Sequence, residues 1–488
     1  MTPSYATSRW LFLRALAVVY LIAFVSLWTQ VQGLIGPNGI VPAEQLLDLV
    51  RQHAGGGRYW DFPTVLWFGA GAGALNLVCG LGALGALVLL FDFWPRGVLA
   101  MLWVLYLSLV SVGRDFLSFQ WDALLLETGF LALLLAPGHL HPRRQAAPPP
   151  VLISVILLWG LLFRLVFESG VVKLTSGDPT WRDLTALDYH FWTQPLATWT
   201  AWYVNLMPEW VKKLGVVTTF LAELVAPILI WLGRRTRRWA FVAIVGFQLL
   251  IFGTGNYTFF NLLTITLALL LIDDEGWKKA LPGWVLRRVP QSLEVAPSHA
   301  GRIGVTIAAV PLLVLGFTSL LMTVGPRGMV PLPALQALAL VSPLSSVNGY
   351  GLFRVMTTTR PEIIVEGSDD GSTWKPYEFR YKPGALDRRP GFVEPHQPRL
   401  DWQMWFAALD QYEISPWFQA FMLRLLQGSP DVLRLLATNP FPDHPPKYLR
   451  AILYNYEFTD LKTRRATGNW WRRTELGPYT SVLSLSEE

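Results

Sequence analysis

Long apolar runs separated by short polar loops fill the chain up to about residue 324. A helix that crosses a membrane needs about 20 mostly apolar residues. Runs of this kind predict about nine spans, at residues 10–31, 64–90, 96–113, 117–136, 151–173, 214–232, 238–255, 258–272 and 303–323. Because only three residues separate the third run from the fourth, one long bent hairpin is an alternative interpretation of that pair.

From Gly325 onward, charged residues, prolines and aromatics mix as they do in water-soluble domains. Alternation at 361–365, a turn rich in Gly, Ser and Asp, and a second alternating stretch at 374–381 predict a β-hairpin. Helical spacing follows at 401–409, 416–426 and 430–436, and strand character returns at 448–458. The sequence therefore predicts a polytopic α-helical membrane bundle (residues 1–324) followed by a soluble α+β domain (residues 325–488) with a β-sandwich-like core.

Composition supports a membrane protein, because 52% of the residues are hydrophobic and only 15% are charged. Soluble chains are about 25% charged. The net charge of +6 does not predict a nucleic-acid partner, since the basic residues lie in short loops and form no basic stripe. The single cysteine, Cys79, excludes an intrachain disulfide and a cysteine-based metal site.

Loop charge predicts how the bundle is oriented in the membrane. Basic residues gather in alternate loops, which the positive-inside rule assigns to the cytoplasm. These residues include Arg96, Arg143, Arg144, Arg234, Arg235, Arg237, Arg238, Lys278 and Lys279. The first run, 11–31, is then a retained signal anchor with a cytoplasmic N-terminus. An odd number of spans places the C-terminal domain outside, in the periplasm or the lumen.

The run at 151–173 carries Arg164, Glu168 and Lys173. Charges at the centre of a membrane helix each cost about 2.5 to 3.5 kcal/mol, so such residues pair, face a polar cavity or perform chemistry. Arg164 and Glu168 stand four residues apart, on one helix face, where they can form a structural ion pair. Lys173 lies near the outer end, where it either snorkels to the interface or acts as a desolvated base.

Two carboxylates occur in the run at 117–136. Asp122 and Glu127 point about 140° away from each other on a helix, so they do not form a paired-carboxylate site by themselves. Asp122 suits a helix start at the interface. Glu127 lies deeper, and we expect it to face the bundle interior, towards Arg164 or Lys173.

The loop after Lys173 is dense in polar and aromatic side chains and is a candidate loop for binding a client or substrate. Its candidate residues are Asp178, Trp181, Arg182, Asp183 and His190. Turn chemistry beside an aromatic belt is the alternative interpretation. His190 has no second ligand three or four residues away, so no metal site is predicted.

Several long segments together resemble the lipase maturation factor family. They are GLIGPNGIVPA at 33–43, QWDALLLETGFLALLLAP at 120–137, the stretch from FRLVFESGVVKL to FWTQPL at 163–196, GNYTFFNLLTI at 255–265 and NGYGLFRVM to YKPG at 348–384. In animals, the resemblance implies an endoplasmic reticulum membrane protein that helps secreted dimeric lipases reach their active state, with a lumenal soluble domain. Short loops, a preference for arginine and the near absence of cysteine favour a bacterial member, in the inner membrane.

A shorter stretch, ESGVVKL followed by Trp181, resembles the A-G-x-K-K-L…W pattern of vitamin K-dependent γ-carboxylase and its bacterial transmembrane relatives. Lys173 matches the catalytic lysine of that pattern, and Val172 replaces the lysine before it. This similarity implies an alternative function, a carboxylase-like or quinone-linked membrane enzyme. Lys173 would be its base, tuned by Glu168 or Arg164, and a quinone-type lipid its cofactor.

The leading prediction is an integral-membrane maturation factor without enzymatic activity, cofactor or metal. Its C-terminal domain would engage a secreted client, by resemblance a lipase, while the bundle contacts membrane lipid. No complete catalytic motif accompanies the family resemblance. A transporter ranks third, because the chain shows no inverted repeat.

Overall fold

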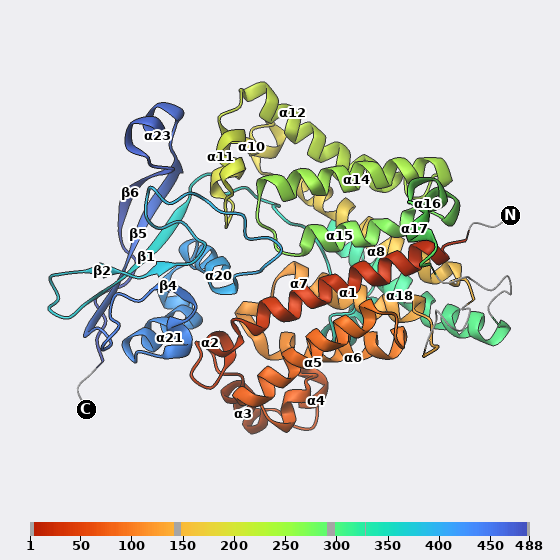
Figure 1. The fold of residues 1–488 in the computed structure, drawn as a ribbon, viewed down its shortest axis with the longest axis horizontal. Coiled ribbons are helices and arrows are strands. Elements are labelled where there is room, and N and C mark those ends of the chain that lie inside the picture. The colour runs from red at the N-terminus through yellow and green to blue at the C-terminus, as the bar shows by residue number, and fades with distance from the viewer. Residues whose placement is uncertain (1–3, 141–147, 290–297, 327, 486–488) are drawn as a thin grey trace.

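The computed structural model describes residues 4–140, 148–289, 298–326 and 328–485, so Arg143 and Arg144 of the predicted inner loops lie outside it. Within those ranges, six helices are long and apolar enough to cross a membrane: Ala6–Trp28, Ala72–Leu90, Pro95–Leu117, Leu152–Thr175, Arg234–Thr254 and His299–Val324. They lie at one end of the molecule, and the β-sheet lies at the other (Figure 1). The chain is thus a multi-pass membrane protein with a separate α+β region.

Not every predicted span forms one long helix. Three of the apolar runs fold into helices that are short or interrupted: α7 (Gln120–Leu135), the series α12 (Glu209–Phe220), η3 (Leu221–Val225) and α13 (Ala226–Ile228), and α15 (Phe260–Ala268) with η4 (Leu269–Leu271). At 1.5 Å per residue, a 16-residue helix such as α7 covers only about 24 Å, less than the hydrocarbon thickness of about 30 Å. The run at 64–90 becomes helical as η1 (Val65–Phe68) and then as α5 (Ala72–Leu90).

The two runs at 96–136 form separate helices that pack against each other. α6 (Pro95–Gly113) ends at the turn η2 (Arg114–Leu117), and α7 then runs back beside it. The long helices α1 (Ala6–Trp28), α8 (Leu152–Thr175), α14 (Arg234–Thr254) and α18 (His299–Val324) complete the bundle, with α18 packed along α8. The shorter helices are α2 (Val31–Ile35), α3 (Ala43–His53), α4 (Arg58–Asp61), α9 (Pro179–Arg182), α10 (Ala186–Thr193), α11 (Trp199–Asn205), α16 (Asp274–Ala280), α17 (Gly283–Leu286), α19 (Leu332–Val341) and η5 (Ser342–Leu344).

A proline explains why α12 widens into a π-turn at η3. Pro227 has no backbone N–H for the carbonyl of Glu223, four residues earlier, and its ring would clash with that carbonyl in a regular α-helix. The wider turn relieves the clash. Single π-turns inside α-helices occur frequently at functional sites.

The C-terminal region is built on a four-stranded antiparallel sheet of order β2-β1-β5-β6. β1 (Pro361–Ser368) pairs with β5 (Tyr448–Phe458) along its whole length, from Pro361 opposite Asn455 to Ser368 opposite Tyr448. The predicted hairpin is confirmed, although its second arm divides into β2 (Lys375–Pro376), which pairs with β1, and β3 (Glu378–Phe379), which pairs with β4 (Leu436–Thr438).

Helices and not a second large sheet pack against this sheet, so the α+β class is confirmed in a form without a full sandwich. α20 (Arg399–Ala408) lies between β1 and the bundle turn η2, and α21 (Pro416–Leu426) packs on β5. β6 (Trp471–Pro478) is an edge strand that its charged sequence did not reveal. The remaining elements are η6 (Tyr412–Ile414), α22 (Pro430–Leu433) and α23 (Leu461–Thr467).

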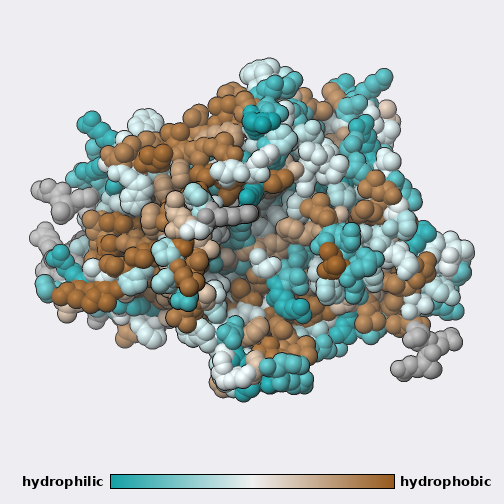
Figure 2. Space-filling view, turned by 180° about the vertical axis from the view of Figure 1, so that it is seen from behind, coloured by the Kyte–Doolittle hydropathy of each residue, from teal (hydrophilic) through white to brown (hydrophobic). Residues whose placement is uncertain are grey.

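One continuous cluster of buried apolar residues extends from the bundle into the C-terminal region, for example from Phe12 through Trp121 and Trp402 to Phe421. The outer helices behave differently. In the most apolar window of α14 only 17% of the residues are buried, and in that of α18 only 22%. Apolar side chains cover much of the bundle half of the surface, whereas polar ones are more frequent on the other half (Figure 2). The exposed apolar side chains of α14 and α18 therefore suit contact with lipid.

Candidate functional site: a polar face of α8 beside a cavity

A non-helical segment follows the last long helix and returns along the polar face of α8. We name residues 346–356 the strap. Non-helical backbone is tolerated at membrane depth only where its polar groups are satisfied by protein or by water in a cavity. The side chains of α7 and α8 supply those partners here, and this explains why an apolar helix carries three charges.

The inner part of this face is a hydrogen-bonded cluster, which we name the deep cluster: Glu127, Arg164, Glu168, Asn348 and Tyr350. Arg164 forms its ion pair with Glu127 of α7, so the predicted Arg164–Glu168 pair is wrong and the predicted approach of Glu127 to Arg164 is confirmed. Arg164 also donates to the Asn348 carbonyl at 2.9 Å.

The two carboxylates of the deep cluster accept hydrogen bonds from the strap. Glu127 Oε2 accepts from the backbone N–H of Asn348 at 2.9 Å and from the Tyr350 hydroxyl at 2.8 Å. Glu168 accepts from the strap N–H of Tyr350 at 2.7 Å. The strap backbone, and not a neighbouring turn of α8, therefore decides how these charges pair.

Asp122, predicted at a helix start beside the membrane interface, lies in the first turn of α7 and faces the C-terminal region. It is fully buried and forms a two-pronged ion pair with Arg399 of α20, at 2.8 and 2.9 Å. The Tyr106 hydroxyl donates to the same carboxylate. Asp122 does begin a helix, but its charge joins the bundle to the C-terminal region. Its partner comes from a distant part of the chain, so no local pattern indicated this contact.

At the outer end of α8, Lys173 is buried and does not snorkel to the surface. Its ammonium group contacts both carboxylate oxygens of Glu223, at 2.9 and 2.8 Å, and donates to the carbonyls of Ser169 and Leu352, at 3.1 Å each. The Trp181 ring lies 5.3 Å from the ammonium. Glu223 comes from the π-turn η3 and was not among the candidate residues. A lone carboxylate in an apolar run, four residues before a proline, was the signal in the sequence.

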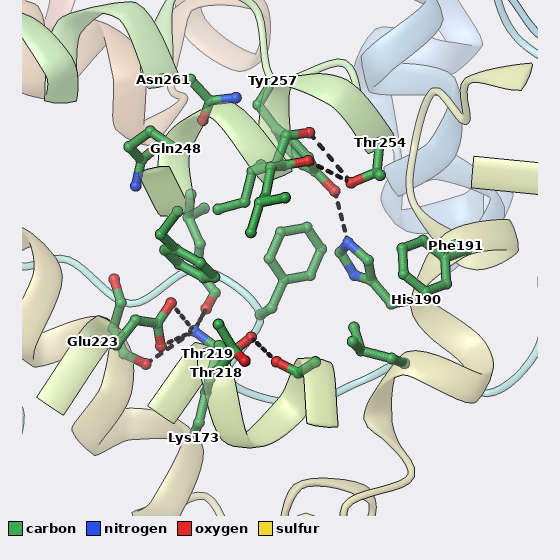
Figure 3. Close-up of a pocket in the computed structure, with 18 of the residues that line it drawn as sticks. Lys173, His190, Phe191, Thr218, Thr219, Glu223, Gln248, Thr254, Tyr257 and Asn261 are labelled. Carbon is green, nitrogen blue, oxygen red and sulfur yellow. Dashed lines mark hydrogen bonds and ion pairs between the residues drawn. The ribbon is translucent and has the colours of Figure 1, made fainter. Parts of the chain in front are cut away.

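Lys173 and Glu223 line a cavity of about 410 Å³ between α8, α10, α12, α14, α15 and the strap. Figure 3 shows the ion pair on one side of this space and the polar side chains of Gln248 and Asn261 on another. His190 closes a third side, with its Nε2 atom 3.3 Å from the Tyr257 hydroxyl, which donates to Gln194 at 2.9 Å. Burial and the charge of Lys173 lower the pKa of His190 to about 4, so its imidazole is neutral near pH 7.

The candidate loop after Lys173 divides into buried and exposed residues. One oxygen of Asp178 caps α9 by accepting from Thr180 N–H at 2.8 Å, and the other accepts from the strap N–H of Met356 at 2.6 Å. Trp181 is buried and donates to the Phe353 carbonyl at 3.0 Å. Because Asp178, Trp181 and His190 are occupied inside the protein, their side chains are not available to a docked client.

Arg182 and Asp183 are the exposed members of that loop, with side chains 81% and 58% exposed. The far end of the loop is held by Arg360, which sequence reasoning did not single out. Its guanidinium is fully buried and donates to the carbonyls of Trp192, Gln194 and Pro195 at the end of α10. The loop is thus fixed at both ends by residues of the strap and of the region that follows it.

In the described parts of the chain, no group of three or more His, Cys, Asp or Glu side chains is placed to hold a metal ion. Many polar groups of the site pair with one another or with backbone, but Glu168 Oε1, Gln248 Oε1 and Asn261 Nδ2 have no hydrogen-bond partner among the described residues. Lys173 is surrounded by four acceptor contacts, so its geometry is that of a held ammonium group and not of a free base.

Fold and site together define a multi-pass membrane protein whose helical bundle is joined to an α+β region by buried charges and a strap. Two family models match, described as the lipase maturation factor transmembrane domain, over residues 7–279, and the lipase maturation factor C-terminal domain, over residues 346–481. The second match begins with the strap. The chain belongs to the lipase maturation factor family.

Relatives named for this family match almost the whole chain. Lipase maturation factor 2 of Gallus gallus is 39% identical over 98% of this chain and 82% of its own length. Lipase maturation factor 2 of Homo sapiens is 38% identical over 98% and 83%, and lipase maturation factor 1 of Bos taurus is 36% identical over 98% and 89%. No solved structure matches. These comparisons give no support to the carboxylase-like alternative.

Proposed function

We propose that this chain is an integral-membrane maturation factor for a secreted client, that the client is a lipase, and that the C-terminal region engages it. The observation that carries the proposal is the similarity over 98% of the chain to proteins named lipase maturation factor. No cofactor and no catalytic step are part of it.

The contacts between the C-terminal region and the bundle support this function. Buried, hydrogen-bonded contacts join the C-terminal region to the bundle at three places: the Asp122–Arg399 ion pair, the strap and Arg360. A buried charge left without its partner costs about 3 to 5 kcal/mol, so these contacts resist separation. The bundle and the C-terminal region therefore form a stiff platform that could hold a folding client close to the membrane surface.

The proposal places the N-terminus in the cytoplasm and the C-terminal region in the periplasm or the lumen. This requires an odd number of crossings, so one or all three of the short or interrupted helix series cross the membrane together with the six long helices. This corresponds to the bacterial inner membrane for this chain and to the endoplasmic reticulum for its animal relatives. The single cysteine, Cys79, is buried, so new cysteines can report the orientation without background. With a membrane-impermeant maleimide added outside intact cells, Ser372→Cys should be labelled and Lys279→Cys only after the membrane is opened. The reverse pattern would refute the orientation.

The function is tested by co-expressing the full chain with a secreted lipase in cells that lack their own maturation factor. Active, secreted lipase per unit of lipase protein should rise severalfold. Arg399→Ala should abolish the gain by releasing the C-terminal region, with the membrane level of the variant measured in parallel. As a matched control, Arg434→Ala removes an arginine from the same region whose side chain is 74% exposed and pairs with Asp431 three residues earlier. Unchanged specific activity for every secreted lipase tried would end the proposal.

A further inference from the structure

The cavity beside Lys173 contains polar atoms that nothing in the described protein satisfies. Gln248 of α14 and Asn261 of α15 line it and are only 6% and 1% exposed. Gln248 Oε1 and Asn261 Nδ2 have no hydrogen-bond partner among the described residues. Buried amide groups are normally paired, and leaving one unpaired is destabilising. One free acceptor and one free donor on adjacent helices therefore indicate a ligand with both kinds of group.

The charged residues of the cavity cancel in pairs. Lys173 is paired with Glu223, and Lys212 is paired with Asp188 at 2.6 Å. His190 is neutral near pH 7. A ligand with a net charge would find no free countercharge among these residues and would have to leave water without compensation. The cavity therefore favours an uncharged ligand.

Most of the remaining lining is apolar, although it includes hydroxyls such as those of Ser169, Thr218 and Thr219, and it reaches the outer surface of the bundle. Leu214 of α12 and Leu250 of α14 line the cavity and are 56% and 62% exposed, on helices whose outer faces suit lipid contact. An alkyl chain can therefore enter between these helices from the membrane. The cavity volume of about 410 Å³ falls in the range of small-molecule sites, roughly 300 to 1,000 Å³.

We infer that this cavity binds an uncharged lipid with one acyl chain and free hydroxyl groups, of the monoacylglycerol class. A glycerol hydroxyl both donates and accepts, so it can satisfy Gln248 and Asn261 together. A quinone has only acceptor oxygens, and leaves Gln248 Oε1 unpaired. A phospholipid brings a charged phosphate that the paired residues cannot neutralise. This inference does not rest on the maturation function.

The test uses the full chain purified in detergent and radiolabelled monooleoylglycerol as the probe. We expect saturable binding at one site per chain. Unlabelled monooleoylglycerol should compete, while a quinone with a long isoprenoid chain and a single-chain phospholipid should compete at least about tenfold less well. Gln248→Leu and Asn261→Leu should each weaken binding about tenfold, since each leaves a lipid hydroxyl unpaired.

Two further variants keep the test decisive if the amide variants fold poorly. Thr218→Phe places a ring into the cavity from the half-buried face of α12 and should abolish binding. Thr266→Val removes a buried hydroxyl from α15 outside the cavity lining and should bind normally. Absent binding, equal binding by Thr218→Phe, or equal competition by the quinone or the phospholipid would each overturn the inference.

Discussion

The two ends of the polar face of α8 hold similar charges in different surroundings. The deep cluster, around Arg164 and Glu127, is packed against the strap and donates to or accepts from its backbone. In the outer pair, Lys173 and Glu223 contact each other, and among the described residues one hydrogen bond joins the pair to the strap, from Lys173 to the Leu352 carbonyl. One end therefore holds the fold together, and the other borders a cavity.

The comparison shows that buried charge alone does not identify a functional residue. Charges in a membrane protein can be retained because a non-helical backbone needs hydrogen-bond partners. The outer pair differs in its surroundings: Glu223 lies in a π-turn, and the pair lines a cavity that also contains the unsatisfied amides of Gln248 and Asn261. Removing charges at each end should separate the two roles.

The largest effect is expected at the deep cluster. Glu127→Leu leaves Arg164 buried without its partner and should lower the free energy of unfolding by about 3 to 5 kcal/mol. The double variant Glu127→Leu/Arg164→Met should remain destabilised, because the N–H of Asn348 and the Tyr350 hydroxyl still lack their acceptor. Chemical denaturation in mixed micelles measures both. Full recovery in the double variant would contradict a role in holding the strap.

At the outer pair, Lys173→Met should cost about 3 kcal/mol, because Glu223 is left buried and unpaired. The double variant Lys173→Met/Glu223→Leu should regain most of that loss, since replacing both ions by apolar residues of similar size is often neutral. The same denaturation experiment applies. A double variant no more stable than Lys173→Met would show that this pair, like the deep cluster, also supports the fold.

A carboxyl outside the membrane helices gives an effect that accumulates with pH, by a smaller amount per pH unit than either charge loss above. Glu394 accepts a hydrogen bond from the N–H of Tyr257, and burial raises its pKa to about 8. The unfolded chain loses this proton near pH 4.3, so the folded state binds more protons between about pH 4.3 and 8. Stability contributed by the protonated carboxyl is therefore complete below pH 4.3 and is lost as the pH rises through 8.

This loss should be on the order of 1 kcal/mol per pH unit in that window. Glu394→Gln keeps a neutral side chain at every pH and should remove this part of the pH dependence. Thermal unfolding of both proteins between about pH 5 and 9 tests the difference. Parallel curves would show that Glu394 is already ionised in the folded protein.

The smallest effect is expected where the candidate loop is exposed. Arg182→Ala and Asp183→Ala should each change stability by less than about 0.5 kcal/mol, because their mutual ion pair, at 3.3 Å, lies in solvent. If this loop contacts the client, lipase maturation should fall while stability stays constant. A large loss of stability from either change would place the residue in the fold after all.

Much of the fold could be predicted because apolar runs and strand alternation are local signals. β5 and α21 begin and end at the predicted residues. β6 was not predicted, because an edge strand can carry charged side chains on both faces. Three predicted spans form short or interrupted helices, because apolar composition alone does not fix the length of a continuous helix, as at α15.

By itself, the sequence determined the membrane bundle, the α+β region and the location of the charges, because each depends on residue type and short-range spacing. Only the tertiary structure decided the partners of those charges. Glu127 pairs with Arg164, Asp122 with Arg399 and Lys173 with Glu223, across 37, 277 and 50 positions of the chain. Such contacts arise when distant segments pack, and spacing along one helix does not indicate them.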